Sequence, residues 1–147
     1  MILLTYLNII FSFSVVNVDV PDFVEDYHNL SSKKEELNYI KKYEESKNND
    51  IKAYVISLKM KQAKYKIFPW SKLVAFNKEK KVLNQLIKAN PKNVHLRYVR
   101  LVIQENAPKI LAFNKYIKSD KLVLISILKI KDKTDYLDEY ILKNTSL

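Results

Sequence analysis

The sequence predicts an all-α protein of about six helices, arranged as a helical bundle or as packed helical hairpins. Apolar residues recur at the three-and-four spacing of one helix face through most of the 147-residue chain. Asparagine, serine and proline stand where these patterns begin and end, as they do at helix termini. The chain also contains no glycine, the residue that tight β-hairpin turns favour, so a β-rich fold is disfavoured.

Composition favours a single helical domain over residues 21–147 and excludes several kinds of chemistry. Hydrophobic residues make up 48% of the chain and charged residues 29%, which is typical of a globular protein. Without cysteine there are no disulfides, thiolate nucleophiles or cysteine metal sites. Without glycine there is no P-loop, dinucleotide fingerprint or nucleophile elbow. We therefore predict no cofactor, no metal site and no enzymatic activity.

The first 20 residues differ from the rest of the chain. Residues 2–16 are almost entirely apolar and the chain turns polar at Asp19, as after the hydrophobic core of a signal peptide. The apolar stretch is shorter than the ~20 residues that a membrane-spanning helix needs. Residues 1–20 are thus predicted to be a signal peptide or apolar leader. The alternative, favoured by the lack of a basic residue near the start, is an apolar first helix or strand that docks on the domain.

Three helices are expected in the first half of the domain. A short acidic helix over 22–29 follows Pro21, and Ser32 with Glu35 forms a capping-box pattern that starts a helix to about residue 47. Asn49-Asp50 is expected to cap a third helix that runs to about residue 68. The side chains predicted to face inward are Leu37, Ile40 and Tyr43 in the second helix, and Ala53, Ile56, Met60, Ala63 and Ile67 in the third.

Two longer helices should form the centre of the fold. Pro69 ends the preceding helix, and the short break before a helix over 69–89 predicts an antiparallel helical hairpin. Asn90-Pro91 ends that helix and is expected to open the next, over 91–106, because proline is preorganised for a first helical turn. Apolar residues lie on almost every side of this last helix, so we expect it to be the most buried one.

The last third of the chain is predicted to hold a brief turn and two helices. Ser119-Asp120 is expected to cap an apolar run over 122–130, which is interpreted as a helix although its β-branched residues would also suit a buried strand. Thr134 is expected to cap the final helix, over 135–144.

Arg97 and Arg100 are the only arginines among 26 basic residues and lie three positions apart. An arginine pair in a lysine-rich chain indicates a need for the planar guanidinium, which binds a carboxylate or phosphate with two bonds. With Gln104 the arginines form one polar wedge on an apolar helix. The wedge has three interpretations: a solvated strip, a set of ion pairs with internal carboxylates such as Asp120 or Glu79, or one side of a groove for an anionic ligand. The structural interpretations are favoured, because arginine is the usual choice for buried ion pairs.

Other residues that often carry chemistry are interpreted structurally. His28 and His95 lie far apart without cysteine or histidine neighbours, which disfavours metal binding and histidine-based catalysis. Trp70 is expected to close one end of the core, the alternative being a stacking platform. The lysine-rich stretches 59–66 and 78–81 are expected to be solvated helix faces, although interleaved aromatic residues would also suit nucleic acid.

Two resemblances to known families accompany these patterns. The stretch Phe76...Leu83...Leu86-Ile-Lys-Ala-Asn-Pro-Lys-Asn93 resembles the second helix and closing Asn-Pro of a tetratricopeptide-type repeat, over about half a unit. A second pattern covers residues 53–144 and consists of Ala-Tyr at 53–54, Ala-Lys-Tyr at 63–65, Phe-Pro-Trp at 68–70, the Asn-Pro to Asn-x-Pro segment over 90–108, Asn114 and Ile-x-x-Asp-Lys at 117–121. With this pattern the chain resembles small exported helical proteins of Bacteroidetes-type bacteria, a group without an assigned activity. This second resemblance implies an export leader rather than a mechanism.

We predict an exported, non-enzymatic helical protein that acts through contacts with a protein partner, in the periplasm or cell envelope. It would be cytoplasmic if residues 1–20 were retained, and no integral membrane span is expected after leader cleavage. The alternative function is a small basic nucleic-acid-binding protein of the cytoplasm, suggested by a net charge of +10. Nucleic acid is the less favoured partner because the lysines are spread along the chain among Asp and Glu, as in an A/T-rich coding bias.

Overall fold

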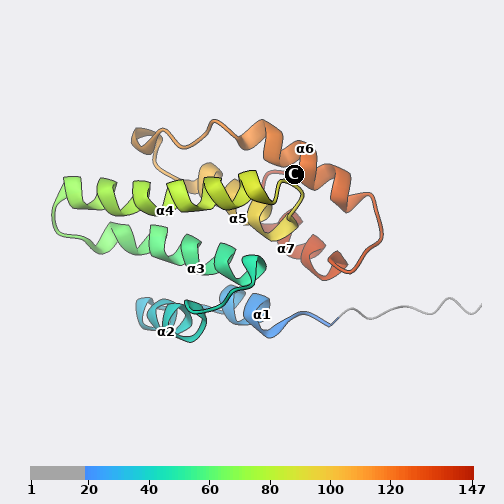
Figure 1. Ribbon diagram of the computed structural model, residues 1–147, viewed down its shortest axis with the longest axis horizontal. Helices are drawn as coiled ribbons and strands as arrows, with labels where there is room; N and C mark the ends of the chain where they lie inside the picture. Colours follow the sequence, from blue (N-terminus) through green and yellow to red (C-terminus); the bar gives the residue numbers. More distant parts are fainter. Residues whose placement is uncertain (1–18) are drawn as a thin grey trace, which may run out of the picture.

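The computed structural model describes residues 19–147, which form seven α-helices and three short 3-10 helices (Figure 1). This range contains no β-strand, so the predicted all-α class is confirmed. Residues 1–18 of the predicted leader lie outside the described residues. The elements are α1 (Asp22–His28), α2 (Lys33–Tyr43), α3 (Asn49–Gln62), η1 (Ala63–Tyr65), α4 (Pro69–Ala89), α5 (Val94–Asn106), η2 (Lys109–Leu111), α6 (Ile117–Leu128), η3 (Asp135–Leu137) and α7 (Asp138–Asn144).

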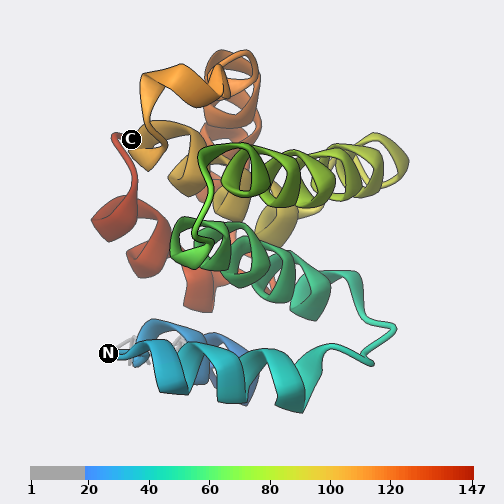
Figure 2. The ribbon, with the colours of Figure 1, turned by 90° about the vertical axis from the view of Figure 1, so that its left-hand side faces the viewer.

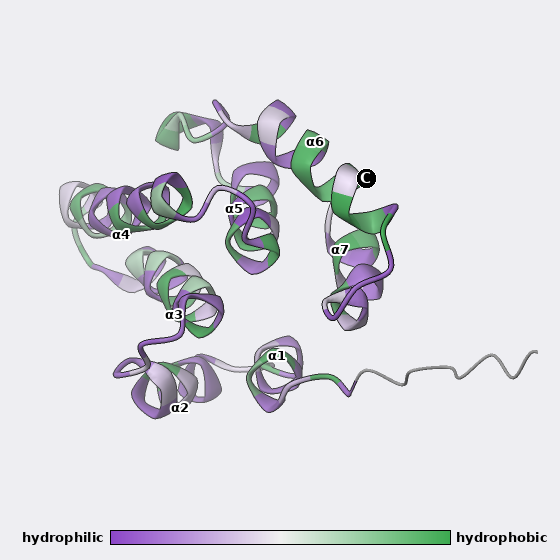
Figure 3. Ribbon diagram, turned by 45° about the vertical axis from the view of Figure 1, so that its right-hand side comes forward, coloured by the Kyte–Doolittle hydropathy of each residue, from purple (hydrophilic) through white to green (hydrophobic). Residues whose placement is uncertain are grey.

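The helices pack around α5. α3 and α4 lie side by side as the antiparallel hairpin that the break at Pro69 predicts (Figure 1). α1 and α2 form a layer on the far side of α3 from α4 (Figure 2). α5 lies between the α3–α4 hairpin and the α6–α7 pair, which is the central position expected of its apolar surface (Figure 3). No helix within residues 19–147 combines the length and the apolar character needed to cross a bilayer.

Several helix termini follow the sequence pattern closely. Ser32 and Glu35 form the predicted capping box at the start of α2, with both reciprocal hydrogen bonds present. Pro69 occupies the first turn of α4, where its missing N–H costs nothing. The cap of α3 is Asn48, whose side chain accepts from the backbone N–H of Asp50, one residue earlier than predicted. The starts of α2, α3 and α4 were therefore predictable to within about one residue.

Three predicted α-helix starts were wrong. The last helix, α7, begins at Asp138 after the 3-10 turn η3, and the Thr134 side chain makes no capping hydrogen bond. α5 begins at Val94 rather than at Pro91, because the side chain of Asn93 accepts from the backbone N–H of Leu96 and supplies the cap. α6 begins at Ile117, so Asp120 lies inside its first turn and is not its cap. A capping side chain stays near solvent, whereas the carboxylate of Asp120 is drawn inward by cations on α5.

The inward face of α2 differs from the prediction at one of its three predicted positions. Ile40 and Tyr43 pack against the core as predicted, but Leu37 does not. Leu37 is 48% exposed, whereas Glu36 and Tyr39 are buried. Glu36 binds Lys61 Nζ at 2.5 Å, and the Tyr39 hydroxyl donates to the Phe23 carbonyl at 2.8 Å. These polar contacts with α3 and α1 rotate the helix, so Leu37 points to solvent. In Figure 3, α2 is accordingly mostly hydrophilic, whereas α6 carries a long hydrophobic run.

α3 ends earlier than its apolar pattern predicts. The helix stops at Gln62, and one 3-10 turn carries the chain to Tyr65. Ile67, expected in the inward stripe, follows this turn and is 86% exposed. The residue before a proline disfavours the helical conformation, and Phe68 accordingly has extended backbone. The consequence is a connection, 66–68, that carries the apolar side chains of Ile67 and Phe68 on the surface at this end of the hairpin.

Candidate functional site

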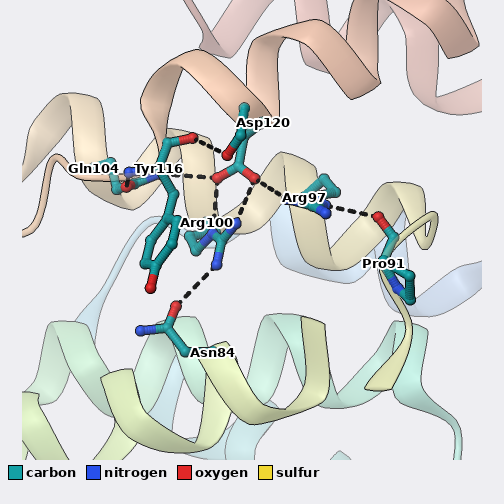
Figure 4. Close-up of polar contacts among 8 residues, drawn as sticks. Asn84, Pro91, Arg97, Arg100, Gln104, Tyr116 and Asp120 are labelled. Carbon is teal, nitrogen blue, oxygen red and sulfur yellow. Dashed lines mark hydrogen bonds and ion pairs between the residues drawn. The ribbon is translucent and has the colours of Figure 1, made fainter. Parts of the chain in front are cut away.

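Asp120 of α6 lies at the centre of the predicted polar wedge, fully buried against one face of α5 (Figure 4). Its Oδ1 accepts from Arg97 Nη1 at 2.8 Å and from Arg100 Nη2 at 2.6 Å. Its Oδ2 accepts from Arg100 Nε at 2.7 Å and from Gln104 Nε2 at 2.9 Å. The structure thus brings together all four residues of the wedge.

The surroundings of the wedge are also internal. Arg100 Nη1 donates to Asn84 Oδ1 of α4 at 2.9 Å, and the guanidinium lies 4.2 Å from the centre of the Tyr116 ring. Gln104 Oε1 accepts from the backbone N–H of Tyr116 at 2.9 Å. Arg97 Nε donates to the carbonyl of Pro91 at 2.9 Å. The cluster therefore joins α4, α5 and the start of α6.

This geometry is that of an internal ion-pair cluster. A carboxylate has about four lone-pair sites, and four side-chain donors fill those of Asp120. No acceptor remains for a substrate proton, and the guanidinium of Arg100 is buried with every nitrogen bonded inside the protein. Of the three interpretations of the wedge, the geometry fits the internal carboxylate, and the carboxylate is Asp120 rather than Glu79.

His95 occupies a second buried polar cluster. Its Nδ1 lies 2.7 Å from the Tyr54 hydroxyl and its Nε2 lies 3.0 Å from the Tyr136 hydroxyl. Burial lowers the pKa of His95, and nearby Asp50 opposes that shift only in part. A neutral imidazole has one donor and one acceptor nitrogen, so one tyrosine donates to the ring and the other accepts from it. Both Tyr54 and His95 are closed to solvent, and the cluster fastens α3, α5 and η3 to one another.

His28 belongs to an adjoining aromatic cluster, and both His28 and His95 pack on the ring of Tyr54. Its ring stacks on Tyr140 with centroids 4.1 Å apart, and the Tyr98 hydroxyl lies 3.4 Å from its Nε2. Burial, followed by the charge of Lys143, lowers the pKa of His28 to about 4. The neutral ring packs α1 against α7. Within residues 19–147 no group of three metal-ligating side chains is placed to hold an ion.

An open groove of about 890 Å³ lies where α3 ends and α4 begins. The ends of α3 and α5, the start of α4, and η2 form its walls, and Tyr27 of α1 also contributes. Its lining includes the buried Met60 and Phe76, together with Ile103. A groove of several hundred Å³ with a mostly apolar lining is of the size that ligands and peptide side chains occupy.

Large apolar side chains lie exposed on and beside the rim of this groove. Trp70 is 66% exposed and Ile110 is 90% exposed, and both line the groove. The ring of Phe68 stacks on Trp70 with centroids 4.7 Å apart. The expectation that Trp70 closes the core is therefore wrong, because the early end of α3 leaves this turn outside the core. We call the exposed set the Trp70 patch, and it consists of Ile67, Phe68, Trp70, Leu73, Val74 and Ile110.

Comparison with known proteins gives no match: no family model, no curated protein and no solved structure matches this chain. The tetratricopeptide-type and Bacteroidetes-type resemblances therefore stay predictions.

The groove is a site that the sequence pattern did not predict. A signal for it was present, since Ile67, Phe68 and Trp70 are large apolar residues in and beside a connection between helices, where polar residues are the rule. Their exposure depends on where α3 stops and on the position of η2, which comes from a distant part of the chain. Neither is visible in the periodicity of the helices.

Proposed function

We propose that this chain is a non-enzymatic helical protein that binds a protein partner at the Trp70 patch and the adjoining groove. The observation that carries this proposal is the stacked pair Phe68 and Trp70, left exposed beside an apolar groove. Contiguous exposed apolar residues mark interaction surfaces, because a partner that covers them removes apolar area from water. Aromatic side chains also supply a large share of the binding energy at protein interfaces.

The non-enzymatic part of the proposal is supported by the state of the titratable clusters. Asp120 has every acceptor site filled, and His95 is enclosed by two tyrosines in the core. General acid–base catalysis needs a group within reach of a substrate proton. The groove is lined by apolar residues, lysines and a few neutral polar residues. Its Ser57 hydroxyl donates to the Tyr27 hydroxyl at 3.0 Å, but burial raises the pKa of Tyr27, which keeps it protonated and makes it a poor base for activating a nucleophile.

Location in the periplasm or cell envelope is part of the same proposal. It rests on the apolar character of residues 1–20 and on the resemblance to exported proteins. N-terminal sequencing of the protein isolated from its native cells tests it. A mature chain that begins near residue 21 is expected, and a chain that retains Met1 would overturn the exported location.

Site-specific photo-cross-linking tests the binding surface. A photoreactive amino acid replaces Leu73, which is 44% exposed on the groove, and in a matched variant it replaces Leu122, which is 61% exposed on α6. Irradiation of the producing cells is expected to yield a defined cross-linked protein from position 73 and none from position 122. The same products from both positions, or none from position 73, would overturn the proposal.

A further inference from the structure

We infer that the partner presents an amphipathic helix whose apolar face carries flanking aspartate or glutamate residues. The inference rests on the proposed function and adds the chemical character of the partner. The inference follows from two features of the groove, which are the lysines that line it and the helical secondary structure of its walls.

Every charged residue that lines the groove is a lysine. Lys61 is neutralised within the chain, because its Nζ lies 2.5 Å from Glu36 Oε1. Lys64 of η1 and Lys72 of α4 are exposed, and neither has a carboxylate partner among residues 19–147. Two unpaired cations therefore flank an apolar surface. A bound segment with carboxylates beside its apolar side chains would match both features, and a basic segment would be repelled.

The backbone around the groove favours a helical occupant over an extended one. One common way for an extended peptide to bind is to add a strand to a sheet edge, and residues 19–147 contain no strand that could accept one. The walls are helices and a 3-10 turn, the setting in which an amphipathic helix inserts side chains at positions i, i+3, i+4 and i+7. On α4 itself, Trp70, Leu73 and Val74 share one stripe and extend the apolar surface beyond the groove.

Two other occupants fit less well. A second copy of the chain packed symmetrically on this face would bring Lys64 and Lys72 against the same lysines of its partner. Single-stranded nucleic acid would use the cations, but base stacking needs free aromatic faces. Phe68 and Trp70 stack on each other, which covers one face of each ring, and the rest of the Trp70 patch is aliphatic, so few faces remain for successive bases.

Trp70 provides a direct reporter, because it is the only tryptophan of the chain and lines the groove. The probes are two synthetic helical peptides of about 14 residues, roughly four turns, with leucine along one face. One carries glutamate beside the leucines and the other carries lysine, and neither contains an aromatic residue. The glutamate peptide is expected to shift Trp70 emission to shorter wavelength with saturation. It should bind at least ~10-fold more tightly than the lysine peptide at low salt, and more weakly as salt rises.

A charge-reversal variant tests whether the two lysines set this preference. Lys64→Glu combined with Lys72→Glu is expected to bind the lysine peptide more tightly than the glutamate peptide. The matched control is Lys118→Glu combined with Lys129→Glu, which changes the net charge equally at exposed positions of α6 and the residue after it. The control variant should keep the original preference. Circular dichroism of both variants checks that the fold is intact.

Several results would overturn the inference. They are equal affinity for the two peptides, no saturable shift of Trp70 emission with either peptide, a preference that the charge reversal leaves unchanged, and loss of the preference in the control variant.

Other occupants of the surface give distinct results. Tighter binding of phosphatidylglycerol vesicles or of oligothymidylate than of the glutamate peptide would assign the surface to a membrane or to nucleic acid. A dimer that Leu73→Glu dissociates would assign it to self-association. If position 73 still gives its cross-link but neither peptide binds, only the inference of an acidic helical partner is overturned. If the cross-link is also absent, the proposed function is overturned as well.

Discussion

Arg100 holds Asp120 by two parallel hydrogen bonds inside the core, from Nε to Oδ2 at 2.7 Å and from Nη2 to Oδ1 at 2.6 Å. The two residues belong to α5 and α6, so the pair fixes how these helices meet. Because both partners are buried, loss of one leaves an uncompensated charge in the core. The arginine pair is therefore best understood as a determinant of helix packing.

Arg100→Lys should destabilise the protein more than Arg97→Lys does. Lysine cannot reproduce the paired contact with Asp120 or reach Asn84 at the same time, so we expect a loss of about 2–3 kcal/mol in the free energy of unfolding. Arg97 makes a single bond to Asp120 and is partly exposed, so its replacement should cost about 1 kcal/mol. Urea unfolding measures the change in the free energy of unfolding for each variant. Equal stability of the Arg100→Lys variant and the parent would contradict the assignment.

Neighbouring positions on α2 should respond in opposite ways to truncation. Glu36→Ala removes the buried partner of Lys61 and Gln62, so we expect a loss of about 1–3 kcal/mol in the free energy of unfolding. Leu37→Ala should change it by less than about 0.5 kcal/mol, because Leu37 lies on the solvent face. The same urea titration distinguishes them. A larger effect at Leu37 would restore the orientation of α2 that its apolar pattern suggests.

Stability should fall as the pH is lowered from about 6.5 to about 4. The pKa of His28 is about 4 in the folded protein against 6.5 for an unperturbed histidine, and the pKa of His95 is also lowered. In this window the unfolded chain binds more protons than the folded chain, so protonation favours unfolding. Well above pH 6.5 the histidines are neutral in both states, and this contribution to the free energy no longer changes.

Unfolding in urea at about pH 7, 5.5 and 4.5 would measure this slope. His28→Gln should reduce it, because glutamine does not titrate. Asp26 and Glu35 have lowered pKa values, so they add to the fall in stability at the acidic end of this window. The comparison of variant with parent cancels this shared contribution. A slope that is the same in the variant and the parent would show that His28 is not held neutral by burial.

Trp70 should behave as a solvent-exposed tryptophan in the free protein. Its emission is expected at long wavelength, with efficient quenching by acrylamide, because the side chain is 66% exposed. Trp70→Ala should change the free energy of unfolding by less than about 1 kcal/mol. Phe76→Ala, in the buried lining of the same groove, should cost about 3–5 kcal/mol. Short-wavelength emission from Trp70 in the free protein would show that the patch is covered.

Local signals account for the parts of the fold that were predictable. The Ser32 capping box and Pro69 each place a helix start by chemistry within a few residues. The apolar pattern of α2 misplaced Leu37, because Leu37 and Glu36 compete for the same inward position. Lys61 and Gln62, 25 and 26 positions further along the chain, decide that competition in favour of Glu36.

Taken alone, the sequence indicated that this chain forms helices, that α5 is the central one, and that its two arginines form one polar wedge, for which internal ion pairs were among the favoured interpretations. These conclusions depend on periodicity, capping and composition, which act over a few residues. Only the tertiary structure decided that Asp120 is a buried partner rather than a helix cap, and that Trp70 lies outside the core. Both outcomes depend on contacts between segments far apart in the chain, α5 with α6 for Asp120 and α3, α4 and η2 for the groove. Such contacts set which polar groups are buried together and which apolar groups are left for a partner.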